Sequence, residues 1–171
     1  TELAKALSDL NIKFNPSTVP QVNFETEKRI NKALFKALRE NNGDGHAKAV
    51  HDVSQGGVWQ TLVEMVGGDR NWPLVGLDIQ CPSTMDPVTF LFSESGGFVC
   101  EVLPSNSEAF EAILNNEGVP FFDIGNTTPT DKIYVSKNNQ TIIDVSILDC
   151  LTAWNQKNKQ TVGTPIYNEK I

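Results

Sequence analysis

VHDVSQGGV, residues 50–58, is the densest local signal in the sequence. The apolar run at 47–51 predicts a short buried strand, and the two glycines of the stretch precede helically spaced apolar residues up to about Met65. A strand that passes through polar residues and glycines into a helix is typical of α/β folds. Such folds bind anions and nucleotides where strands end and helices begin. The stretch therefore predicts both the fold class and the place of a candidate site.

Strands and helices alternate on both sides of this stretch. Upstream, Ile30, Leu34 and Leu38 recur at four-residue spacing, which predicts an amphipathic helix over 24–41. Downstream, the pattern predicts strands at 74–79, 98–103, 121–124, 132–135 and 141–145, and helices from Asp86, over 105–116 and over 147–154.

The last two predicted strands flank a polar turn at 136–140, so they form an antiparallel hairpin and make the sheet mixed. We therefore predict an α/β (or α+β) domain with a layered α/β/α architecture. The expected organisation is an N-terminal helix and proline-containing connector at 1–23, the domain itself at 24–155, and a polar C-terminal tail at 156–171.

The composition narrows the range of partners. The chain has 171 residues, of which 39% are hydrophobic, and a formal net charge of −7. An acidic surface repels nucleic acids and anionic membranes, so we expect neither as a partner. No apolar run is long enough to span a bilayer, and the chain starts without a signal-peptide pattern or Met, so we expect a cytoplasmic protein and a fragment of a longer chain. A nucleotide remains possible because Mg²⁺ can bridge carboxylates and phosphates.

The first candidate site lies within 51–57. Asp52 could hold a hard cation, Ser54 could donate to a phosphate, and Gly56 and Gly57 would let backbone amides approach a ligand closely. The alternative is structural: Asp52 or Ser54 caps the helix and the glycines make a tight turn. Spacing alone favours this alternative, because the stretch is neither a Walker A motif nor a complete GxGxxG.

The second candidate is FSESGGF, residues 92–98. A functional interpretation places Glu94 and Ser95 in the same cleft as Asp52. The alternative is a helix C-cap with one of the glycines in a left-handed conformation, and composition slightly favours it. His51, beside Asp52, could act as a general base, although a histidine at a strand end is more often structural.

Taken together, these motifs resemble a known family. HDVSQGG at 51–57, followed by LVEM at 62–65, is similar to the HDxSDGG…AEM signature of formylglycinamide ribonucleotide (FGAR) amidotransferases, in the aminoimidazole-ribonucleotide-synthetase-like superfamily. LFSESGG at 91–97 is similar to the family's next block, and GVP at 118–120 with Ile124-Gly125 to a later one. The resemblance covers about 20–155, with the blocks in the family's order. Gln55 departs from the signature, which has Asp there.

The resemblance implies a partly ferredoxin-like C-terminal domain of the superfamily. It implies that Asp52 binds Mg²⁺ and that Ser54, with Gly56 and Gly57, contacts ATP or ADP, in a cleft shared with the N-terminal domain of the same synthetase. His51, Glu94 and Ser95 would be cleft residues, and no residue of this chain would be catalytic. The whole enzyme would use ATP to amidate FGAR with ammonia from a glutamine amidotransferase domain or subunit, and the isolated domain would be inactive.

Two other interpretations stay open from the sequence. The chain could belong to another ATP-dependent synthetase or kinase of the superfamily. It could also be a non-catalytic α/β interaction module, in which the glycine turns have only a structural part.

Overall fold

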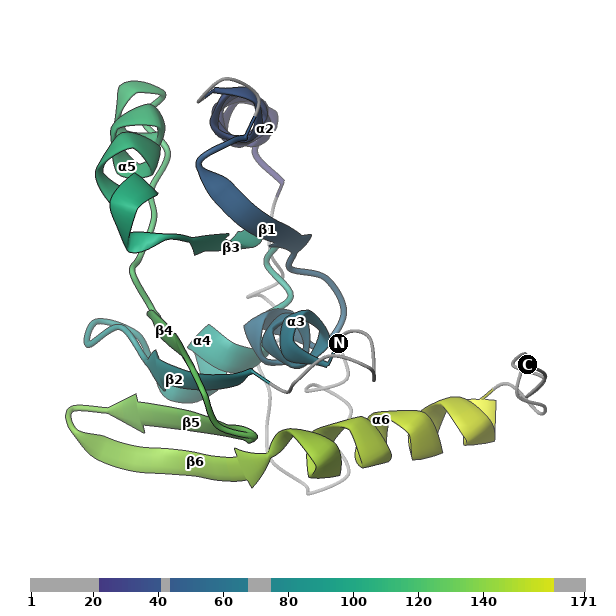
Figure 1. Ribbon diagram of the computed structural model, residues 1–171. Helices are drawn as coiled ribbons and strands as arrows, with labels where there is room; N and C mark the ends of the chain where they lie inside the picture. The colour runs from purple at the N-terminus through teal and green to yellow at the C-terminus, as the bar shows by residue number, and fades with distance from the viewer. Residues whose placement is uncertain (1–21, 41–43, 68–74, 162–171) are drawn as a thin grey trace, which may run out of the picture. The chain divides into compact units, whose positions relative to one another are not determined.

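A computed structural model describes residues 22–40, 44–67 and 75–161 (Figure 1). These residues form two compact units. The first unit consists of the chain up to Leu62 and of Met85–Asp123, and the second of Val63–Thr84 and the chain from Ile124 onward. The expected N-terminal helix and connector lie outside the described residues, apart from residues 22 and 23.

The first unit is built on a two-stranded antiparallel sheet of β1 (Ala47–Asp52) and β3 (Phe98–Val102). Helices α2 (Phe24–Arg39) and α5 (Ser107–Asn116) lie side by side against this sheet (Figure 1). Between them lies a core of Ala33, Ala37, Ala47, Phe110, Ile113, Leu114 and Val119. The unit also contains the start of α3 (Gly57–Val66), the short helix α4 (Pro87–Phe92) and the 3₁₀ turn η2 (Pro104–Asn106).

The sequence of α2 favours a helix at both of its ends. The Asn23 side chain accepts a hydrogen bond from the Thr26 amide at 3.1 Å and so caps the N-terminus. Acidic residues occupy the first turn and basic residues the last, as the helix dipole favours. The predicted inner stripe was partly wrong: Leu34 is buried, but Leu38 is 42% exposed and alanines complete the buried face. A strict four-residue repeat drifts around a helix of 3.6 residues per turn, which carries Leu38 out of the core.

The second unit holds a four-stranded sheet in the order β4 (Gly125–Thr128), β2 (Gly76–Gln80), β5 (Lys132–Lys137), β6 (Gln140–Ser146). Only β2 and β5 are parallel, so the predicted mixed sheet is confirmed. The predicted hairpin turns at Asn138 and Asn139, which have positive φ angles of 51° and 64°. Asparagine tolerates this conformation well, and it suits a tight two-residue hairpin.

Two predicted elements differ from the structure. The strand expected at 121–124 is absent, and β4 follows it at Gly125–Thr128 instead, since pairing with β2 outweighs the low strand propensity of that segment. The closing helix, α6 (Ile147–Thr161), continues well past the expected end at 154. The segment expected as a polar tail therefore starts within this helix, and the rest of it lies outside the described residues. No helix among the described residues is long and apolar enough to cross a membrane.

Cys100 on β3 packs against the core of the first unit, as a filler of apolar space. Burial raises the pKa of its thiol to about 11. Only the thiolate reacts with alkylating reagents, so at pH 8 we expect Cys100 to react with iodoacetamide roughly 100-fold more slowly in the folded chain than in urea. Mass spectrometry of the alkylated peptide checks this. A difference below about tenfold would contradict the burial of this thiol.

Candidate functional site

The two glycine-containing loops singled out from the sequence meet in the first unit. Strand β1 ends at Asp52 and β3 begins at Phe98, and these two residues are register partners. The Val53 amide then donates to the Gly97 carbonyl at 2.9 Å. The stretch that leaves β1 and the stretch that enters β3 therefore lie together at one end of the two-stranded sheet.

A side chain also joins the two loops. The Gly56 amide donates a hydrogen bond to Oε1 of Glu94 at 3.1 Å, across 38 residues of sequence. The Gly57 amide donates to the Ser54 carbonyl at 3.1 Å. The amides of Gly56 and Gly57, which the sequence indicated as candidates for binding a phosphate, thus both have partners within the chain.

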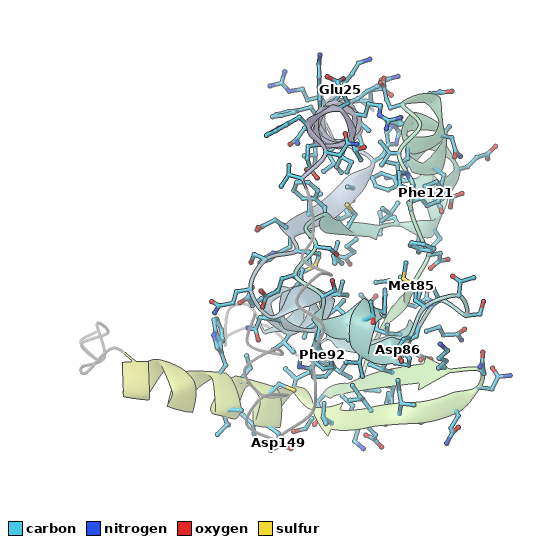
Figure 2. The ribbon with its side chains drawn as sticks, turned by 180° about the vertical axis from the view of Figure 1, so that it is seen from behind. Glu25, Met85, Asp86, Phe92, Phe121 and Asp149 are labelled. Carbon is cyan, nitrogen blue, oxygen red and sulfur yellow. The ribbon has the colours of Figure 1, made fainter. Side chains whose placement is uncertain are left out.

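Gly57 is held by close packing as well as by its amide. Its φ angle is +70°, and a Cβ at this position would lie 2.7 Å from the Leu91 carbonyl oxygen and 2.9 Å from backbone atoms of Phe92. Figure 2 labels Phe92 where α4 ends, beside the start of α3. The Phe92 ring also contacts Trp59, with 6.5 Å between centroids. Only glycine allows α3 to begin this close to the end of α4.

Thr61 is a site residue that sequence reasoning missed. It is 2% exposed, and its hydroxyl lies 3.2 Å from the Asp52 carbonyl oxygen and 3.1 Å from that of Gly57. The hydroxyl has one proton to donate, which these two acceptors share. This contact holds the backbone of Asp52 to the first turn of α3. The available signal was a small polar residue directly before the apolar pair Leu62 and Val63.

Asp52 presents its carboxylate to solvent. The side chain is 67% exposed, and Oδ1 lies 3.6 Å from Nδ1 of His51. The same His51 nitrogen lies 2.8 Å from the Asp52 carbonyl oxygen, which can only accept, so this bond requires the tautomer with a proton on Nδ1. Ser54 and Ser95 are exposed and Glu94 is half-buried.

This geometry suits a shared metal site better than a complete one. No group of three or more His, Cys, Asp or Glu side chains in the described ranges could hold a metal ion. Asp52 could give one oxygen ligand to a hard cation such as Mg²⁺, which prefers six and accepts them from phosphates and water. The donor chemistry therefore fits Mg²⁺ if a nucleotide and another domain complete the shell.

A family model and several curated proteins match this chain. The family model of the AIR synthase related protein, C-terminal domain, matches residues 4–138. A phosphoribosylformylglycinamidine synthase subunit PurL from Streptomyces avermitilis is 36% identical over 109 residues, which are 62% of this chain and 13% of that protein. The PurL subunit of a Synechocystis strain is 28% identical over 139 residues, which are 79% of this chain and 17% of that protein. The chain thus spans less than a fifth of the length of these relatives.

Solved structures share the fold. Phosphoribosylformylglycinamidine synthase II from Thermotoga maritima superposes with a TM-score of 0.63 at 18% identity, over 77% of this chain and 22% of that one. Thermotoga maritima PurL complexed with ATP gives 0.62 at 18% identity, over 74% and 22%. The structure of PurLQS from the same organism gives 0.63 at 17% identity, over 76% and 22%.

Proposed function

This chain belongs to the family of the AIR synthase related protein, C-terminal domain, and from that premise we propose that it is the last such domain of a phosphoribosylformylglycinamidine synthase. In this proposal the domain forms one wall of a Mg-nucleotide cleft. The observation that carries the proposal is the bond from Gly56 to Glu94, because it gathers the two loops that resemble the FGAR amidotransferase signature beside the exposed carboxylate of Asp52. The names of the similar PurL subunits support the same activity.

The proposed roles follow from what each side chain presents. Asp52 contributes a carboxylate oxygen to Mg²⁺, and Ser54 donates its hydroxyl to the nucleotide. Gly56 and Gly57 shape the turn, since their amides are already bonded within the chain. His51 and Ser95 line the cleft. The N-terminal domain of the same synthetase supplies the remaining ligands, in agreement with the lack of a three-ligand cluster among the described residues.

The proposed reaction is the ATP-dependent amidation of FGAR. The γ-phosphoryl group of ATP moves to the glycinamide carbonyl oxygen of FGAR and leaves ADP, which turns that oxygen into a good leaving group. Ammonia then attacks the carbon, and inorganic phosphate departs with the oxygen. A glutamine amidotransferase domain or subunit supplies the ammonia, and the cytoplasm is the proposed compartment. Solved PurL structures in complex with ATP and with FGAR support the choice of ligands.

The test separates the domain from the whole protein. We expect the whole protein that carries this chain to form ADP only when FGAR and ammonia are both present. Residues 1–171 alone should form no ADP above background, because one carboxylate and one hydroxyl cannot complete a Mg-nucleotide site. A coupled ADP assay on both proteins measures this. FGAR-dependent ADP formation by residues 1–171 would contradict the shared cleft, and its absence from the whole protein would contradict the activity.

A further inference from the structure

We infer that Glu94 is a positioning residue, which fixes the turn at the start of α3 and does not ligate the metal or the nucleotide. The inference rests on the proposed function and narrows its site to the Asp52 and Ser54 side chains. The resemblance between FSESGG and the family's motif left open whether the carboxylate of Glu94 meets a ligand. In the structure, this carboxylate accepts a hydrogen bond from the Gly56 amide.

The carboxylate of Glu94 has a partner within the chain. Oε1 of Glu94 accepts the Gly56 amide at 3.1 Å in a partly buried contact. A carboxylate is a favourable acceptor at the N-terminus of a helix, where unpaired amides and the helix dipole attract negative charge. Glu94 therefore occupies the position that a phosphate oxygen would need in order to bind this amide. A nucleotide at the cleft would therefore find the amides of Gly56 and Gly57 already bonded within the chain.

The backbone on both sides of Glu94 is also fixed to the same turn. Before it, Leu91 and Phe92 pack against Gly57 so closely that no Cβ fits between them. After it, the Gly97 carbonyl accepts the Val53 amide. The backbone is thus held before and after Glu94, and the hydrogen bond from the Gly56 amide to its side chain lies between these two contacts. Loss of this bond would loosen the backbone that carries Asp52 and Ser54.

The test uses two substitutions with opposite expectations. In Glu94→Gln the side chain keeps an oxygen that can accept the Gly56 amide, so the affinity of the whole protein for Mg-nucleotide should stay within about threefold. Glu94→Ala removes the acceptor, and the affinity should fall about tenfold or more because the turn loosens. Glu101→Gln, an exposed carboxylate on β3, is the matched control and should change nothing. Calorimetric titration with a non-hydrolysable ATP analogue and Mg²⁺ gives these affinities.

A second readout is independent of the nucleotide. Without nucleotide, hydrogen exchange at the Gly56 amide should be about tenfold faster in Glu94→Ala than in the unmodified protein, and nearly unchanged in Glu94→Gln. Unchanged exchange in Glu94→Ala would overturn the inference. So would an affinity that falls equally in Glu94→Gln and Glu94→Ala, the result expected of a metal ligand. If the unmodified protein binds no Mg-nucleotide, the proposed function fails, while exchange at Gly56 still decides the role of Glu94.

Discussion

Gly57→Ala is expected to lower the free energy of unfolding of the chain by about 3 kcal/mol. The φ angle of +70° costs an L-residue roughly 1–2 kcal/mol. The new Cβ would also lie 2.7 Å from the Leu91 carbonyl oxygen and 2.9 Å from backbone atoms of Phe92, none of which can turn away as a flexible side chain would. Forcing α3 and α4 apart adds roughly 1–3 kcal/mol. Urea denaturation followed by circular dichroism measures the change.

Gly96→Ala is the matched control for this substitution. Gly96 has a similar φ angle of +81°, but nothing lies within 4 Å of the position that its Cβ would take. Only the backbone conformation is penalised, so the loss should be about 1 kcal/mol. Equal losses in the two variants would show that the contact between Gly57 and α4 does not contribute to stability.

The fold could be predicted from sequence where the signal is local. The apolar run at 47–51 predicts a strand, and the glycines that follow mark a turn before helically spaced apolar residues. Both β1 and α3 form where these patterns predict them. The hairpin of β5 and β6 follows from its polar turn in the same way. The division of the strands between two sheets could not be predicted, because strand pairing joins segments far apart in the sequence. Residues 125–128 (GNTT) form a strand and residues 121–124 (FFDI) do not, because residues 125–128 pair with β2. This pairing could not be predicted from the local sequence either.

The candidate site shows the same limit. Pairs of glycines beside polar residues marked both loops, since few residue types other than glycine accept a positive φ. The bond between Gly56 and Glu94 could not be predicted, because nothing local relates two residues 38 positions apart. Thr61 was missed because a hydroxyl within an apolar helix face gives no sign of its distant acceptor, the Asp52 carbonyl.

The second large effect is expected from Asp52→Asn in the whole protein. A hard cation prefers a carboxylate to an amide oxygen, so the dissociation constant for Mg-nucleotide should rise roughly 100-fold, equivalent to about 2.7 kcal/mol. The melting temperature should barely change, because the side chain is 67% exposed and its backbone is held through the carbonyl by Thr61. Ser54→Ala should give a milder loss, with metal binding largely kept.

Asp86→Asn supplies the matched control. Asp86 is an exposed carboxylate of the same unit that caps α4 by accepting the Thr89 amide at 3.0 Å. Asparagine caps helices about as well as aspartate, so neither stability nor nucleotide affinity should change. A loss of affinity in this variant as well would indicate a general effect of surface charge.

The proposed function depends most on the role of Asp52 as a ligand of the metal of a nucleotide bound to this domain. Its most direct test is calorimetric titration of the whole protein and of Asp52→Asn with Mg²⁺ and a non-hydrolysable ATP analogue, beside their melting curves. We expect Asp52→Asn to bind the Mg-nucleotide roughly 100-fold more weakly than the unmodified protein, at an unchanged melting temperature. Unchanged affinity in Asp52→Asn would contradict the metal role of Asp52 and leave the glycine loops with a structural part alone.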